Sequence, residues 1–80
     1  MAQFIPHGGA VYEVRAVLDI GDLQQFVGGF VRFLDIGFGN HIVCHEDAEL
    51  VYSKNALASS LSQRPVHGPA IICRMKELEL

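Results

Sequence analysis

Residues 23–34 read Leu-Gln-Gln-Phe-Val-Gly-Gly-Phe-Val-Arg-Phe-Leu, and two structural patterns meet in this stretch. Before the glycines, apolar residues recur at the spacing of a short helix over residues 23–27. After the glycines the residues are β-branched and aromatic, as is typical of a strand. Gly28 and Gly29 supply backbone angles that other residues avoid, so they can end a helix and lead directly into a strand. The segment therefore predicts a structural role for both glycines.

The order of helix and glycines also argues against a phosphate-binding loop. Such loops place their glycines before a helix, so that free backbone amides face the anion. Gly28 and Gly29 follow the expected helix and precede a strand. This order favours the structural interpretation over a phosphate cradle.

Outward from this corner, the chain divides into short apolar segments separated by turns. Segments that alternate between apolar and polar residues, or that are rich in β-branched residues, predict strands. The expected strands cover residues 3–5, 10–18, 30–36, 41–45, 50–52 and 70–75. A second helix is expected over residues 56–61, and Asp22 and Asn55 are the expected N-caps of the two helices. The glycine-rich turn at residues 37–40 joins two of the strands into a β-hairpin.

These elements lack the regular strand–helix alternation that builds a parallel sheet. The sequence therefore predicts a single α+β domain over residues 1–80, with a small antiparallel sheet of four to five strands and two short helices packed on one face. Residues 3–5 are expected at an edge of this sheet. The end segments, residues 1–9 and 76–80, are expected to fray.

The composition narrows the classes of function. Half of the 80 residues are apolar and only 19% are charged, which argues against a disordered chain. A chain of this length hides only about 60–65% of its unfolded surface. We therefore expect a homo-oligomer whose interface covers the surplus of apolar side chains, with a well-packed monomer as the alternative. The net charge is −3 and the six Lys and Arg residues are scattered, which argues against nucleic-acid binding.

The cysteines and the start of the chain bear on the compartment. Cys44 and Cys73 lie in apolar, strand-like runs, where free cysteine behaves as a small buried hydrophobe. The first residues lack the charged and long apolar regions of a signal peptide, and no apolar run is long enough to span a membrane. We therefore expect a cytoplasmic protein with reduced thiols and no membrane contact. A disulfide between the two cysteines remains open if their strands are neighbours.

Five residues form the candidate ligand-binding set: Lys54, Asn55, Arg64, His67 and Gly68. Asn55 opens a helix, and helix N-termini attract anions. Arg64 offers a guanidinium that can grip a phosphate with two hydrogen bonds, and His67 and the amides around Gly68 complete a pocket. In the alternative interpretation Asn55 only caps the helix, Gly68 makes a turn and Arg64 is solvated.

Phe38 is the candidate for partner binding, because two glycines flank it at the tip of the expected hairpin. Exposed aromatic residues are enriched at the energetic centres of interfaces. The alternative is that its ring folds back onto the core.

Metal and catalytic chemistry are not expected. The run His41-x-x-Cys44-His45 lies in a strand, where residues four apart are about 13 Å from each other. Zinc requires ligands that converge to about 2.0–2.3 Å from the ion. No nucleophile, base and orienting group can be assigned together, so we expect neither a metal, nor a cofactor, nor an enzyme.

Three segments in order resemble the family of small phage and bacterial proteins classified as domain of unknown function 3846. They are residues 23–31, the motif Asn55-x-x-Ala58-Ser59, and His67-Gly68 followed by the apolar run 70–73. The resemblance spans about residues 11–74. The loop Val-His-Gly-Pro at residues 66–69 departs from the family pattern, which has an aliphatic residue before the glycine and often an acidic one after it.

The resemblance implies a phage-type accessory protein that acts by binding in the host cytoplasm. Small accessory phage proteins counter host defence either by sequestering a nucleotide-like ligand or by occluding a host protein. The expected function is therefore non-enzymatic binding of one of these two kinds. The alternative is a structural or regulatory homo-oligomer with no small-molecule site.

Overall fold

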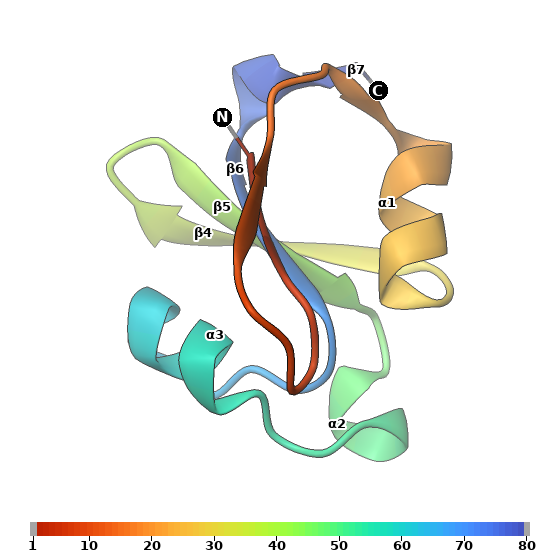
Figure 1. Cartoon of the computed structure of the whole chain (residues 1–80), viewed down its shortest axis with the longest axis vertical. Helices are drawn as coiled ribbons and strands as arrows, with labels where there is room; N and C mark the ends of the chain where they lie inside the picture. The colour runs from red at the N-terminus through yellow and green to blue at the C-terminus, as the bar shows by residue number, and fades with distance from the viewer. Residues whose placement is uncertain (1, 80) are drawn as a thin grey trace.

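The computed structural model describes residues 2–79, which form a five-stranded antiparallel sheet, a small two-stranded sheet and short helices (Figure 1). The elements in chain order are β1 (Ala2–Ile5), β2 (Tyr12–Val14), β3 (Leu18–Asp19), α1 (Ile20–Val27), β4 (Val31–Gly37), β5 (Asn40–His45), α2 (Ala48–Val51), α3 (Ala56–Ser62), β6 (Ala70–Arg74), the 3₁₀ turn η1 (Met75–Glu77) and β7 (Leu78–Glu79). The main sheet has the order β2-β1-β6-β5-β4, and β3 pairs in parallel with β7. The predicted α+β class and the small antiparallel sheet are confirmed.

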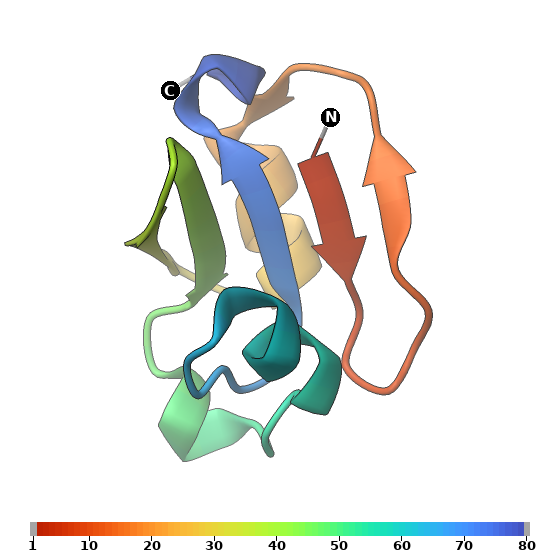
Figure 2. The same ribbon diagram turned by 90° about the vertical axis from the view of Figure 1, so that its left-hand side faces the viewer.

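The two main helices lie on opposite faces of the sheet, so the expectation that they share one face is wrong. Figure 2 shows α3 in front of the strands and α1 behind them. One buried cluster joins Leu23 of α1 to Val43 and Ile71, and a second joins Ala58 of α3 to Ile42. Because β5 and β6 carry consecutive apolar residues, successive side chains point to both faces, and each face needs its own cover.

The ends of the described chain are built into the sheets. β1 lies between β2 and β6 rather than at an edge, and Ala2 and Ile5 are fully buried. The segment expected to fray after residue 75 forms η1 and then β7, which pairs with β3. Sequence patterns underestimate such elements because their partners are distant in the chain.

Helix α1 begins three residues earlier than expected. Asp19, not Asp22, is the N-cap: its carboxylate accepts from the amide of Asp22, while the Asp22 carboxylate accepts from the amide of Asp19. This reciprocal pair is a capping box. Gly28 ends the helix with φ +86°, in the left-handed region that favours glycine. A Cβ on Gly29 would lie 2.6 Å from Nε2 of His45, so this glycine permits close packing.

The strand expected at residues 50–52 is instead the single-turn helix α2 followed by Tyr52. The amides of Leu50 and Val51 bond back to the carbonyl of Asp47, at 2.9 and 3.2 Å. Leu50 is 84% exposed and has no strand beside it. Without a neighbouring strand to pair with, the backbone satisfies itself locally.

Candidate ligand-binding site

The loops before and after α3 are tied together by backbone hydrogen bonds. The amide of Asn55 donates to the carbonyl of Val66 at 2.8 Å, and the amide of Gly68 donates to the carbonyl of Ser53 at 3.0 Å. Between these bonds Lys54 and His67 form an isolated antiparallel bridge. The structure therefore brings four of the five candidate residues together, at the base of α3, and leaves Arg64 at the other end of the helix.

Asn55 is buried, with only 3% of its surface exposed. Its side-chain oxygen accepts from the amide of Ala58 at 3.0 Å. Its side-chain nitrogen donates to the carbonyls of Gly68, at 2.8 Å, and Ile5, at 3.3 Å. Both amide hydrogens and the carbonyl oxygen are thus occupied by the protein, so Asn55 joins α3 to β1 and to the loop before β6.

Gly68 is also used by the structure itself. It has φ +71°, and a Cβ there would lie 2.5 Å from the ring of Tyr52. At the end of the same side chain, the hydroxyl of Tyr52 donates to the carbonyl of Val27 at 3.0 Å. Tyr52 therefore locks the loop of Gly68 against the end of α1, a role that the sequence analysis missed.

Arg64 lies just beyond α3 and lines two hollows in the surface. The larger, of about 600 Å³, is lined by Arg32, Leu34, Glu49, Ser62, Gln63, Arg64 and Pro65. The smaller, of about 490 Å³, is lined by Lys54, Ala56, Ser59, Ser60, Arg64 and Pro65. We call the two hollows together the Arg64 cleft. Within residues 2–79 the guanidinium of Arg64 has no hydrogen bond or ion pair, and the residue is exposed.

Arg32 and Glu49 form the far wall of the larger hollow. Nη2 of Arg32 donates to Oε1 of Glu49 at 3.1 Å. This bond raises the pKa of Arg32, although partial burial opposes the effect. The pKa of Glu49 is lowered by its own backbone amide and then by Arg32. Nε of Arg32 is buried without a partner among the described residues.

Sequence reasoning missed Arg32 and Glu49 as members of the site. The signal for Arg32 is its position as the single charged residue in an apolar strand run, residues 30–34. Such a residue needs a partner or water, since an unpaired charge is costly to desolvate. Nothing local predicts that the partner is Glu49, because 17 residues separate the two.

The Arg64 cleft has a positive balance of charge although the chain has a net charge of −3. It contains the cations Arg32, Arg64 and Lys54 and one carboxylate, Glu49. Guanidinium groups bind phosphate and carboxylate with two parallel hydrogen bonds. Ser60 adds an exposed hydroxyl at the smaller hollow. The arrangement suits an anionic ligand.

The remaining two members of the candidate ligand-binding set, His67 and Lys54, differ in their relation to the Arg64 cleft. His67 is half-buried and lines neither hollow of the cleft. Lys54 lines the smaller hollow and also a third one, of about 380 Å³, beside the turn at residues 6–9. There Nε2 of His7 lies 2.7 Å from Oγ of Ser53. No described group bonds the other ring nitrogen of His7, so the pair lacks an orienting partner.

Cys44 and Cys73 are both free and buried. They lie on opposite faces of the sheet, since Cys73 belongs to the cluster under α1 and Cys44 contacts Arg32. Burial raises the pKa of Cys44, and it raises that of Cys73 to about 11. Both thiols therefore stay protonated at neutral pH. Among residues 2–79, no three His, Cys, Asp or Glu side chains gather as metal ligands would.

Phe38 stands at the tip of the β4–β5 hairpin and is 97% exposed. Its backbone has φ +56°, unusual for a residue with a side chain. The ring therefore does not fold back onto the core. It lines neither hollow of the Arg64 cleft and belongs to neither buried cluster.

Comparisons with known proteins assign no family to the chain. No family model matches it, and neither the curated proteins nor the solved structures include a significant match. The resemblance to domain of unknown function 3846 therefore stays a hypothesis. In the part of the chain that the structure describes, the helices are all too short or too polar to cross a membrane.

Proposed function

We propose that the protein is a non-enzymatic binding protein that takes up an anionic, nucleotide-like ligand in the Arg64 cleft. One observation carries this proposal: the uncommitted guanidinium of Arg64 lies between two hollows that also contain Arg32 and Lys54. A free cation on a surface is ordinary, but three cations that line two hollows sharing Arg64 and Pro65 favour a multivalent anion. Phosphate groups fit this pattern, because each can accept a bidentate bond from a guanidinium.

The size of the cleft is consistent with a small ligand. Its hollows measure about 600 and 490 Å³ and are open to solvent rather than enclosed, so a small ligand would lie on the surface with one side exposed. The apolar side chains of Leu34 and Pro65 line it beside the cations. An apolar wall next to a phosphate grip suits a ligand that has both a ring and a charged group.

The absence of catalysis is part of the proposal. The thiols have raised pKa values, so neither supplies a thiolate nucleophile near neutral pH. The Ser53–His7 pair lies at the 380 Å³ hollow and outside the Arg64 cleft. Catalysis by a serine needs its base held in place by a third group, as in a triad.

The biological role follows from the resemblance alone. A phage-type accessory protein in the host cytoplasm that sequesters a nucleotide-like signal would blunt a host defence that depends on this signal. Simple sequestration needs only tight, reversible binding and no turnover. The cleft chemistry is compatible with this role.

A second candidate function is occlusion of a host protein, and the exposed apolar residues favour it. Phe38 is 97% exposed, Leu50 84% and Phe30 69%. Such residues supply binding energy when a partner covers them. They are spread over the β4–β5 hairpin tip, α2 and the turn after α1, rather than gathered at the Arg64 cleft.

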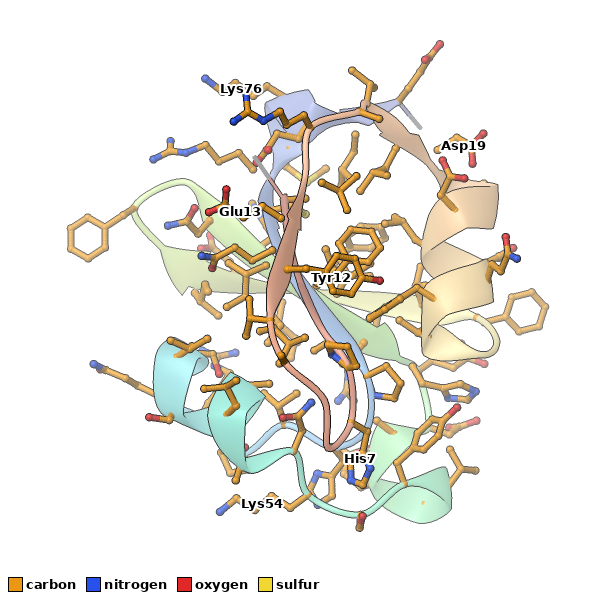
Figure 3. The ribbon with its side chains drawn as sticks, viewed as in Figure 1. His7, Tyr12, Glu13, Asp19, Lys54 and Lys76 are labelled. Atoms are coloured by element: carbon orange, nitrogen blue, oxygen red, sulfur yellow. The ribbon has the colours of Figure 1, made fainter. Side chains whose placement is uncertain are left out.

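Native mass spectrometry of freshly purified protein tests the proposal. We expect extra mass that disappears on denaturation and that is reduced in the variant Arg64→Ala. Lys76→Ala is the matched control, because it removes a cation at the opposite end of the molecule from Lys54 (Figure 3). Protein stripped of ligand and then mixed with ADP should regain the added mass. Failure of ADP, AMP and pyrophosphate to bind the stripped protein would overturn the proposal.

A further inference from the structure

The two edges of the main sheet are protected differently. The edge strand β4 has an irregular register between Asp35 and Gly37, where the amide of Gly37 donates to the carboxylate of Asp35 at 2.8 Å. Bulges, prolines and lysines discourage further strands from adding to an edge. The other edge strand, β2, pairs with β1 in regular register, and residues 10–17 contain neither proline nor lysine. β2 is therefore an open edge.

The sequence of this open edge is complementary to itself. Residues 12–16 read Tyr-Glu-Val-Arg-Ala. When two copies run antiparallel with Val14 facing Val14, the opposing residues match in charge and in size. The pairs are Tyr12 with Ala16, Glu13 with Arg15 and Val14 with itself. β2 itself ends at Val14 and the chain bends at Ala16, so pairing requires Arg15 to join the strand and ends at that bend.

Charge supplies the first argument for this partner. Glu13 and Arg15 are both exposed, and neither has an ion pair within the described chain. Figure 3 shows Glu13 on the side of β2 that points away from α1. In the antiparallel register each Glu13 faces the Arg15 of the other copy, so the two-fold axis creates two cross-strand ion pairs. Opposite charges directly across a sheet stabilise it, and like charges destabilise it.

The other side of β2 supplies the second argument. Tyr12, Val14 and Ala16 line a hollow of about 500 Å³, with Phe4 and Phe26 beneath them. The ring of Phe4 lies 5.5 Å from that of Tyr12 and 4.6 Å from that of Phe26. Tyr12 is nevertheless 48% exposed. A second copy of β2 would cover this ring and would place the two hollows next to each other.

We propose that two copies of this chain pair through β2 in antiparallel register about Val14. The result is a continuous sheet of ten strands, five from each copy. The interface is isologous, since the same surface contributes from both sides. Addition of a strand to a free edge satisfies its open backbone groups as well as its side chains. The Arg64 cleft involves none of these residues and stays free in the dimer.

Sedimentation equilibrium of the whole chain provides the test. The monomer mass is 8.8 kDa, and we expect wild-type protein to form a dimer of twice that mass. Glu13→Arg or Arg15→Glu places like charges at both symmetry-related pairs. Each single variant should raise the dimer dissociation constant by about tenfold or more. The double variant E13R/R15E restores opposite charges and should dimerise nearly as well as the wild type.

The controls separate pairing from general effects of charge. Glu46→Arg changes an exposed acidic residue away from β2 and should leave the dimer unchanged. Both sites are exposed, so circular dichroism should show the same fold in all variants. A monomeric wild type at millimolar concentration would overturn the proposal. So would a dimer that both single variants leave intact, or a double variant as weak as the singles. None of these outcomes depends on whether the Arg64 cleft binds a ligand.

Discussion

The two ends of α3 use their polar residues in opposite ways. At its start, Asn55 is buried and the protein occupies all of its side-chain hydrogen-bonding groups. Beyond its end, Arg64 is exposed and the described chain offers its guanidinium no partner. The sequence places both residues in one candidate ligand set, but in the structure the protein occupies the side chain of Asn55 and leaves that of Arg64 exposed, so only Arg64 belongs to the proposed ligand site. Changes at the start of α3 should therefore affect stability, and changes beyond its end should affect binding.

Asn55→Ala should cause the largest loss of stability. It removes the cap of α3 and leaves the carbonyls of Gly68 and Ile5 without their donor. We expect the free energy of unfolding to fall by about 2–4 kcal/mol, measured by urea denaturation. Asn55→Asp keeps the capping oxygen but places a buried carboxylate oxygen against the carbonyls of Gly68 and Ile5, so its loss should be at least as large. Ordinary surface substitutions change stability by less than about 0.5 kcal/mol. A loss that small for Asn55→Ala would contradict the structural role assigned to Asn55.

Gly68→Ala should cause the second-largest loss of stability. The new Cβ must adopt φ +71° and displace the ring of Tyr52, which lies 2.5 Å from its position. We expect a loss of about 1–3 kcal/mol in the same denaturation experiment. Gly8→Ala is the matched control, since Gly8 has φ +77° and open space around its Cβ position. Equal losses of stability in the two variants would mean that close packing against Tyr52 does not contribute to the cost of Gly68→Ala.

Arg64→Ala tests the other end of α3. Because its guanidinium has no partner in the described chain, stability should change by less than about 0.5 kcal/mol. Affinity for ADP, measured by calorimetry, should fall by about 10- to 100-fold, as expected for loss of a charge-assisted bond. Unchanged affinity together with a large loss of stability would reverse the assigned roles. Lys76→Ala should change neither quantity.

Glu49→Gln should cause the smallest change, an effect on affinity for ADP. The direction of this change is informative. Removing this carboxylate frees Arg32 from its ion pair and makes the cleft more positive. We expect affinity for ADP to rise by about 2- to 5-fold at low salt and the gain to shrink at high salt. A drop in affinity would show that Glu49 positions Arg32 for the ligand rather than competing with it.

Local features of this fold could be predicted from the sequence, while features set by distant partners could not. The cap at Asn55, the helix end at Gly28 and the β4–β5 hairpin each depend on a few neighbouring residues. The placement of α1 and α3 on opposite faces was missed, although the consecutive apolar residues of β5 and β6 indicate cover on both sides. The Arg32–Glu49 pair spans 17 residues and has no local signature.

The same limit applies to the candidate site, whose residues were chosen from residue type and local position. Arg64 was identified because an exposed arginine near a helix is a plausible anion ligand from residue type alone. Gly68 and Asn55 were assigned to the ligand because their types also occur at anion sites. Their real partners, Tyr52 and the carbonyl of Ile5, lie 16 and 50 residues away in the chain. Only the folded structure shows that these groups are already occupied.

A nuclear magnetic resonance titration of ¹⁵N-labelled wild-type protein with ADP tests the central claim most directly. If the cleft beyond α3 recognises anions, amide shifts should concentrate at residues 59–65 and near Arg32. Asn55 and Gly68, whose polar groups the protein already uses, should move little, whereas Lys54 lines the smaller hollow and should shift together with the cleft. Shifts centred on Asn55 and Gly68, or no saturable shift at any residue, would contradict the account.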